Sequence, residues 1–192
     1  EKITQREEKP SFASTSAKAS EDKKASEGRE KIEISQKVAV GALKYSVLKQ
    51  AIGSDIIYDF EKSISFQGDS GPYLQYSLAR ANSVLEKGKK EKIKATLIYK
   101  YASESTNKTS NLEKMMLYFP EVVEKAGREF EPHGIVLYLT ELASAFNGYY
   151  GQNKIVDKAD EFSPYKLSLT QAFTVIIKNG LWLLGIPAPE KM

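Results

Sequence analysis

The side chains of this chain that could do chemistry are cationic and aromatic. Lysines crowd one short stretch beside only Glu86 and Glu91, at positions Lys87, Lys89, Lys90, Lys92 and Lys94. Such a stretch can neutralise phosphates and release the counterions that surround a nucleic acid. It can equally be an ordinary solvated surface, so lysine spacing alone leaves both interpretations open.

Two tandem tyrosines, Tyr149 and Tyr150, end the helix predicted at 132–150 and are followed by the polar sequence GQN. An exposed aromatic face near lysine can stack an unpaired base, which is worth about 1–3 kcal/mol. Adjacent helical residues face directions about 100° apart, so one of the two tyrosines is expected to pack in the core.

Catalytic constellations are missing from the sequence. It has one histidine and no cysteine, which excludes disulfides and thiolate metal sites and argues against zinc. No phosphate-binding loop of the G-x-x-x-x-G-K-[ST] type occurs. His133 follows Pro132 at a helix start, where it is expected to pack or cap, and Asp157 and Asp160 are expected to be solvated. We therefore predict no catalytic residue, no metal and no cofactor on this chain.

The elements that must position these residues are predicted to be helices. Apolar residues recur at helical spacing in most of the chain, and Gly53, Gly88 and Pro120 punctuate them. The predicted helices are 34–52, 72–87, two short pieces between 115 and 126, 132–150 and 164–184. Residues 55–72 favour an extended segment and a loop, residues 93–101 fit helix or strand, and residues 103–110 favour a loop. Amphipathic helices with short connections predict a mainly α fold, a helical bundle.

Composition and charge also bear on the organisation and the surroundings of the chain. Residues 1–31 are almost entirely polar and of low complexity, which predicts a flexible tail or linker. The net charge of +3 is too small to decide for nucleic acid by itself. No apolar run approaches the roughly 20 residues that span a bilayer, and no signal peptide is recognisable. We expect a soluble, cytoplasmic protein without a membrane partner.

Five strings, in this order, resemble the C-terminal half of the class I arginyl-tRNA synthetases. They are GALKYSVLKQ (41–50), SFQGDSGPYLQYSLAR (65–80), FPEVVEKA (119–126), YLTELASAFNGYY (138–150) and NGLWLLGIPAPEKM (179–192). The resemblance implies a helical bundle of the anticodon-binding type at 72–192, after a junction helix and loop at 32–71. Residues 1–31 depart from the family, which has a short helical connection there.

The resemblance also implies site residues. A structural or tRNA-facing role is implied for Gly68, Gly71, Tyr73, Gln75, Tyr76 and Arg80, although both glycines can also be simple turn residues. Tyr150 corresponds to an aromatic position that packs against anticodon-loop bases, and Met192 to a terminal residue near the same loop. The predicted tRNA-binding residues are Tyr150, Met192, Tyr149, Gln75, Tyr76, Arg80, Lys89 and Lys90.

The function implied is recognition of the anticodon arm of arginine tRNA, as part of an ATP-dependent arginine–tRNA ligase. The HIGH and KMSK signatures of its catalytic domain do not occur in this sequence. The resemblance therefore implies that the binding of ATP and arginine lies on a catalytic domain elsewhere in the natural chain, and that this chain alone is inactive. The alternative is a stand-alone helical module that binds a protein or another RNA, which upstream sequence would distinguish.

Overall fold

The structure is a computed structural model that describes residues 12–96 and 110–192, with side chains from residue 27 onward. Contacts divide the chain into two compact units, Glu1–Gln36 and Lys37–Met192. The described residues form helices and connecting loops and contain no strand. This confirms the predicted mainly α fold.

The first unit consists, where it is described, of the beginning of helix α1 (Phe12–Leu48). The sequence predicted a tail without regular structure up to residue 31, so the helix begins earlier than the expected start at Ile34. Alanine, lysine and glutamate are strong helix formers, and Glu27 stands four residues before Lys31, a favourable helical spacing. Local propensity therefore gives a helix where no apolar stripe predicts one. The role of this segment as a linker stays a prediction.

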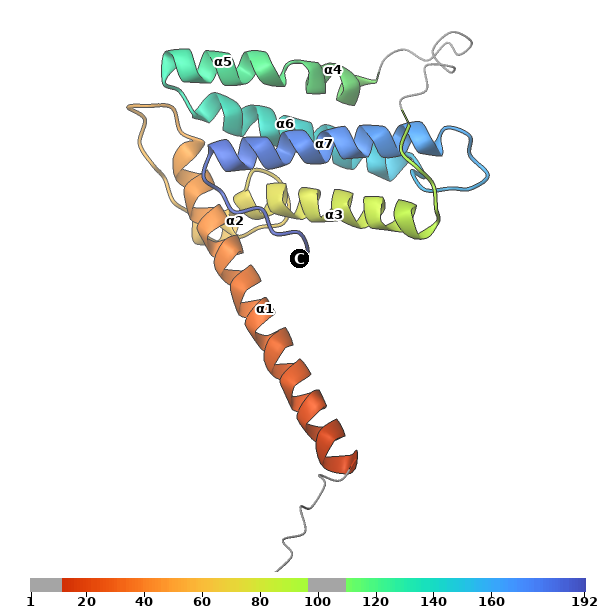
Figure 1. Ribbon diagram of the computed structural model, residues 1–192. Coiled ribbons are helices and arrows are strands. Elements are labelled where there is room, and N and C mark those ends of the chain that lie inside the picture. The colour runs from red at the N-terminus through yellow and green to blue at the C-terminus, as the bar shows by residue number, and fades with distance from the viewer. Residues whose placement is uncertain (1–11, 97–109) are drawn as a thin grey trace, which may run out of the picture. The chain divides into compact units, whose positions relative to one another are not determined.

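The second unit is a bundle whose three long helices are α3 (Gly71–Lys90), α6 (His133–Gln152) and α7 (Ser163–Leu183). Figure 1 shows these three running side by side, with α4 (Asn111–Leu117) and α5 (Phe119–Glu129) along one side of α6. The remaining element is the single turn α2 (Phe60–Ser63). No described helix is long and apolar enough to cross a membrane.

The core of the bundle lies between the long helices. The rings of Phe146 and Phe173 stack with centroids 4.0 Å apart and an angle of 8°. Gly180 brings α7 close to α6, because a Cβ at this position would lie 2.5 Å from a methyl carbon of Leu139. Fully buried aliphatic side chains surround them, namely Leu74, Leu78, Leu139, Leu142 and Ile177. Each contributes about 1.5–3 kcal/mol through burial.

Helix ends follow local chemistry. Ser70 precedes α3 and its hydroxyl accepts a hydrogen bond from the Tyr73 amide at 3.1 Å, while Pro72 occupies the first turn as predicted. The break between α4 and α5 falls at Tyr118, next to the predicted position at Pro120. Ser110 and Glu113 form a capping box that starts α4.

The junction differs in detail from the prediction. Helix α1 ends at Leu48 rather than at Ile52, and the expected extended segment contains the turn α2, whose first residues are capped by Asp59. The loop leads to Gly68, whose φ of 76° is a left-handed conformation that favours glycine. The undecided segment 93–101 and the predicted loop 103–110 lie largely outside the described residues.

Candidate functional site

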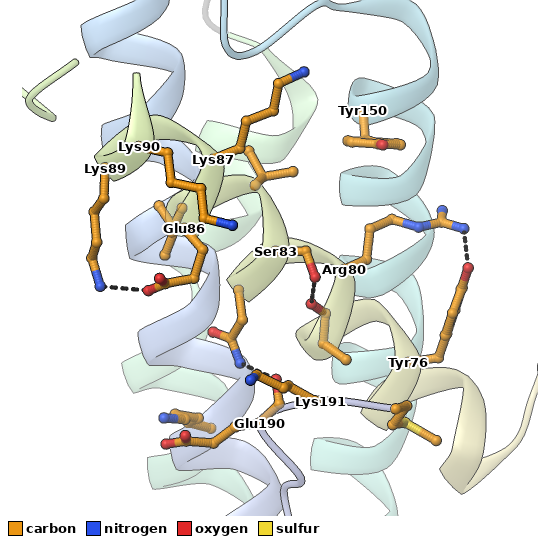
Figure 2. A pocket seen from close by; sticks show the side chains of 16 residues that line it. Tyr76, Arg80, Ser83, Glu86, Lys87, Lys89, Lys90, Tyr150, Glu190 and Lys191 are labelled. Carbon is orange, nitrogen blue, oxygen red and sulfur yellow. Dashed lines mark hydrogen bonds and ion pairs between the residues drawn. The ribbon is translucent and has the colours of Figure 1, made fainter. Parts of the chain in front are cut away.

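A groove of about 1100 Å³ runs along α3, where α6, α7 and the C-terminal segment (185–192) border it. Figure 2 shows its lining from close by. Six of the eight predicted site residues line this groove, namely Tyr76, Arg80, Lys89, Lys90, Tyr150 and Met192. The structure therefore brings together residues that are more than a hundred positions apart in the sequence.

Arg80 lies at the centre of the polar contacts in the groove. Its guanidinium donates one hydrogen bond to the Tyr76 hydroxyl at 3.1 Å and another to Asn147 Oδ1 at 2.8 Å, the first of which is drawn in Figure 2. The guanidinium carbon also lies 4.7 Å from the ring centroid of Tyr76 and 5.2 Å from that of Tyr150. A cation is thus held beside two aromatic rings.

Asn147 fixes the direction of Arg80. Its amide nitrogen donates to the Tyr73 hydroxyl at 3.0 Å and to Ser77 Oγ at 2.9 Å, which leaves the amide oxygen for the guanidinium. Asn147 precedes Tyr150 by three residues, so both lie on one face of α6. The sequence prediction missed Asn147, although it lies within the string YLTELASAFNGYY (138–150).

The C-terminal segment forms one wall of the groove because α3 holds it. The Asn82 amide donates to the Glu190 carbonyl oxygen at 3.3 Å, and the Gln75 amide donates to that of Pro187 at 2.7 Å. Met192 ends this wall with 40% of its surface exposed. These anchors bring Met192 into the lining of the same groove as Tyr150.

The electrostatic balance of the groove is positive. Six cationic side chains line it against the two carboxylates of Glu86 and Glu190, and they are Arg80, Lys87, Lys89, Lys90, Lys178 and Lys191. Lys89 pairs with Glu86 at 2.6 Å, and this hydrogen bond lowers the pKa of the Glu86 carboxyl. The other lysines of the groove form no ion pair among residues 27–96 and 110–192. Such a surface attracts a polyanion.

Two predicted site residues do not line the groove. Tyr149 is half-buried against the hydrophobic core, and burial raises the pKa of its hydroxyl to about 12. Tyr149 is therefore the core member of the tyrosine pair, and Tyr150, 40% exposed, is the groove member. Gln75 is fully buried and bonded to backbone carbonyls, so the prediction that it faces a ligand does not fit the structure.

The acidic residues and the histidine considered in the sequence lie beside oppositely charged or acidic neighbours. Asp157 pairs with Lys154 at 2.8 Å and Asp160 with Lys166 at 2.7 Å. His133 is largely covered and lies 3.9 Å from Glu131. Within the part of the chain that the structure describes, no three histidine, cysteine or acidic residues cluster as metal ligands would. The groove can thus bind a ligand through charge and stacking.

Comparison with known proteins gives consistent matches. The family model described as the DALR anticodon binding domain matches residues 74–192. An arginine–tRNA ligase of Pyrococcus abyssi is 39% identical over 163 residues, which cover 85% of this chain and 26% of that protein. An arginine–tRNA ligase of Clostridium beijerinckii is 37% identical over 163 residues, which cover 84% of this chain and 28% of that protein.

Solved structures agree with these matches. The arginyl-tRNA synthetase of Thermus thermophilus superimposes with a TM-score of 0.68 and 35% identity, over 81% of this chain and 26% of that one. The chain thus spans about a quarter of the length of the relatives that it matches.

Proposed function

The chain belongs to the family of DALR anticodon-binding domains, and we propose that it binds the anticodon arm of arginine tRNA as the C-terminal part of an arginine–tRNA ligase. The proposed partner in the same natural chain is the catalytic domain, which would use ATP to attach arginine in the cytoplasm. The chain alone would lack that activity, because neither catalytic signature occurs in its sequence.

The observation that carries this proposal is the placement of Arg80 between two tyrosine rings in a positively charged groove. Anticodon-loop bases are unpaired, so they can splay outward and stack on aromatic rings, while lysine and arginine contact the backbone phosphates. Both kinds of group face this groove within one set of helices. A groove built to bind an apolar metabolite would not need this excess of cations.

Tyr150→Ala tests the proposal directly. If a loop base stacks on Tyr150, its loss should weaken the binding of an arginine anticodon stem-loop by about 1–3 kcal/mol. Affinity should be measured by fluorescence anisotropy of labelled RNA, for this stem-loop and for one with altered loop bases, at two salt concentrations. The variant should also lose part of the discrimination between the two RNAs.

Tyr118→Ala is the matched control, since Tyr118 is also an exposed tyrosine but does not line the groove. It should leave both affinities unchanged. A folded Tyr150→Ala variant that binds both RNAs like the parent would contradict the assignment of the groove. Equal affinity of the parent for the two stem-loops would instead favour the alternative of a less selective interaction module.

A further inference from the structure

Gln75 occupies an unusual position for an amide. It is fully buried on α3, and its Nε2 donates to the Lys37 carbonyl oxygen of α1 at 3.0 Å and to that of Pro187 at 2.7 Å. Both partners are acceptors, so the amide nitrogen must face them. One side chain therefore joins α1, α3 and the C-terminal segment.

Two glycines make room for this junction. A Cβ at Gly41 would lie 2.6 Å from Gln75 Nε2, and one at Gly71 would lie 2.2 Å from the Gly41 carbonyl oxygen. Any larger residue would push α1 away from α3 and would separate the amide from the Lys37 carbonyl. Gly71, predicted as a turn or tRNA-facing residue, is thus required for close packing.

The junction carries an energetic cost that packing alone would not require. Gln75 Oε1 is buried without a hydrogen-bond partner. An unpaired buried oxygen destabilises a fold, and an aliphatic side chain of similar volume would avoid this cost. The two hydrogen bonds of the amide nitrogen are what such a replacement would lose.

We propose that Gln75 is a positioning residue for RNA recognition: by holding Pro187 against α1 and α3, it sets where the last residues of the chain lie in the groove. This inference rests on the proposed function. Pro187 stands just before the residues that form the wall, Glu190, Lys191 and Met192. The Asn82 bond to Glu190 is longer, at 3.3 Å, so Gln75 is the tighter of these two anchors.

The test is a double-mutant cycle between Gln75→Leu and Met192→Ala in the full chain. If Gln75 acts through the wall, Gln75→Leu should weaken binding of the arginine anticodon stem-loop by roughly three- to tenfold. Met192→Ala should then weaken binding little further in the Gln75→Leu background, because Gln75→Leu has already displaced Met192 from its place in the groove. Thr170→Val is the control, since Thr170 is also fully buried but bonds only within its own helix.

A second measurement separates this inference from the proposed function. The chain has three methionines, so the methyl resonance of Met192 can be assigned by its loss in Met192→Ala. Without RNA, Gln75→Leu should shift this resonance, whereas those of Met115 and Met116 on α4 should stay in place. If Gln75→Leu does not fold, Gln75→Met fills the same space with a more adaptable side chain.

Additive effects of the two substitutions on binding, or an unchanged Met192 resonance in a folded variant, would overturn the inference. A lower melting temperature with unchanged loop-base discrimination would reduce Gln75 to a purely structural residue. If the parent chain binds no anticodon stem-loop while the Met192 resonance still shifts, the proposed function fails and the placement of the wall by Gln75 stands.

Discussion

Two neighbouring hollows share Lys87 but differ in what they can bind. The groove contains six cationic side chains and two carboxylates. The smaller hollow, of about 300 Å³, lies between the end of α3 and residues 154–158 and is lined by Lys87, Glu91, Lys154, Val156, Asp157 and Lys158. Both are rich in lysine, so lysine content alone does not distinguish them.

Pairing of the charges does distinguish them. In the smaller hollow, Lys158 lies 2.7 Å from Glu91 and Lys154 lies 2.8 Å from Asp157. Hydrogen bonds from these lysines hold the pKa of both carboxyls below their usual values. Lysines that are already paired release little free energy by meeting a phosphate, because the existing contact must first break. The lysines of the groove are mostly available.

Aromatic surface separates the two hollows further. The groove presents Tyr76 and Tyr150 on either side of Arg80, whereas the smaller hollow has Val156, which is buried. The groove can therefore take a base and its phosphate together. The smaller hollow offers neither a stacking face nor a free set of cations. The groove therefore differs from the smaller hollow in combining unpaired cations with exposed rings.

The largest effect is expected from Arg80→Met, which removes the cation at the centre of the groove. Loss of a charge-assisted hydrogen bond to RNA should cost about 1.5–3 kcal/mol, or roughly 10- to 150-fold in affinity for the arginine anticodon stem-loop. Titration of labelled RNA measures it. Arg128→Met on α5 is the control, since Arg128 is an exposed arginine paired only with Glu124. Equal losses in both variants would mean that the groove has no special role.

An effect of intermediate size is expected from charge reversal of lysines, which compares the salt dependence of RNA binding at the two hollows. Lys90→Glu with Lys178→Glu changes two unpaired groove lysines, and it should flatten the dependence of log affinity on log salt by about 1.4–1.8. Lys154→Glu with Lys158→Glu changes the paired lysines of the smaller hollow, and it should flatten this dependence by less than half as much. Binding isotherms at several salt concentrations give both slopes. Equal slopes in the two variants would remove the distinction between the hollows.

The helices were predictable because apolar spacing reports burial directly. Val136, Leu139 and Phe146 recur on one face of α6 and all lie in the core. The start of α1 was not predictable in this way, because helix propensity without an apolar stripe leaves helix and tail equally open. Residues in 97–109 lie outside the described structure, so the predictions for them stay untested.

The groove was predictable only in part. Tyr150 and Met192 came from the resemblance, since helical geometry decides only that one tyrosine of the tandem is buried. Lys178 and Lys191 were missed, because their place beside α3 depends on how α7 and the C-terminal segment return across the bundle. The resemblance left Gln75 with a structural or a tRNA-facing role, and the spacing of the sequence could not choose between them, because its partners are carbonyls distant in sequence.

The smallest effect is expected when the lysines of the smaller hollow lose their carboxylate partners. Replacing Glu91 by Gln and Asp157 by Asn in one variant should free Lys158 and Lys154 from their ion pairs. The side-chain oxygen of the new asparagine can still accept the hydrogen bond that the Ala159 backbone amide donates to Asp157. If pairing is what prevents the smaller hollow from binding RNA, the variant should bind all RNAs slightly more tightly, by less than about threefold, with a steeper salt dependence and unchanged loop-base discrimination.

The same pairs also predict how the parent responds to pH. Because both carboxyls have lowered pKa values, they stay ionised as the pH falls from about 7 to about 5, so the parent should show no corresponding gain from these pairs over that range. Glu124→Gln on α5 is the control, because it removes one acidic charge far from either lining. If the double variant gained nothing beyond this control, pairing would not explain the difference, and the aromatic rings of the groove alone would have to account for it.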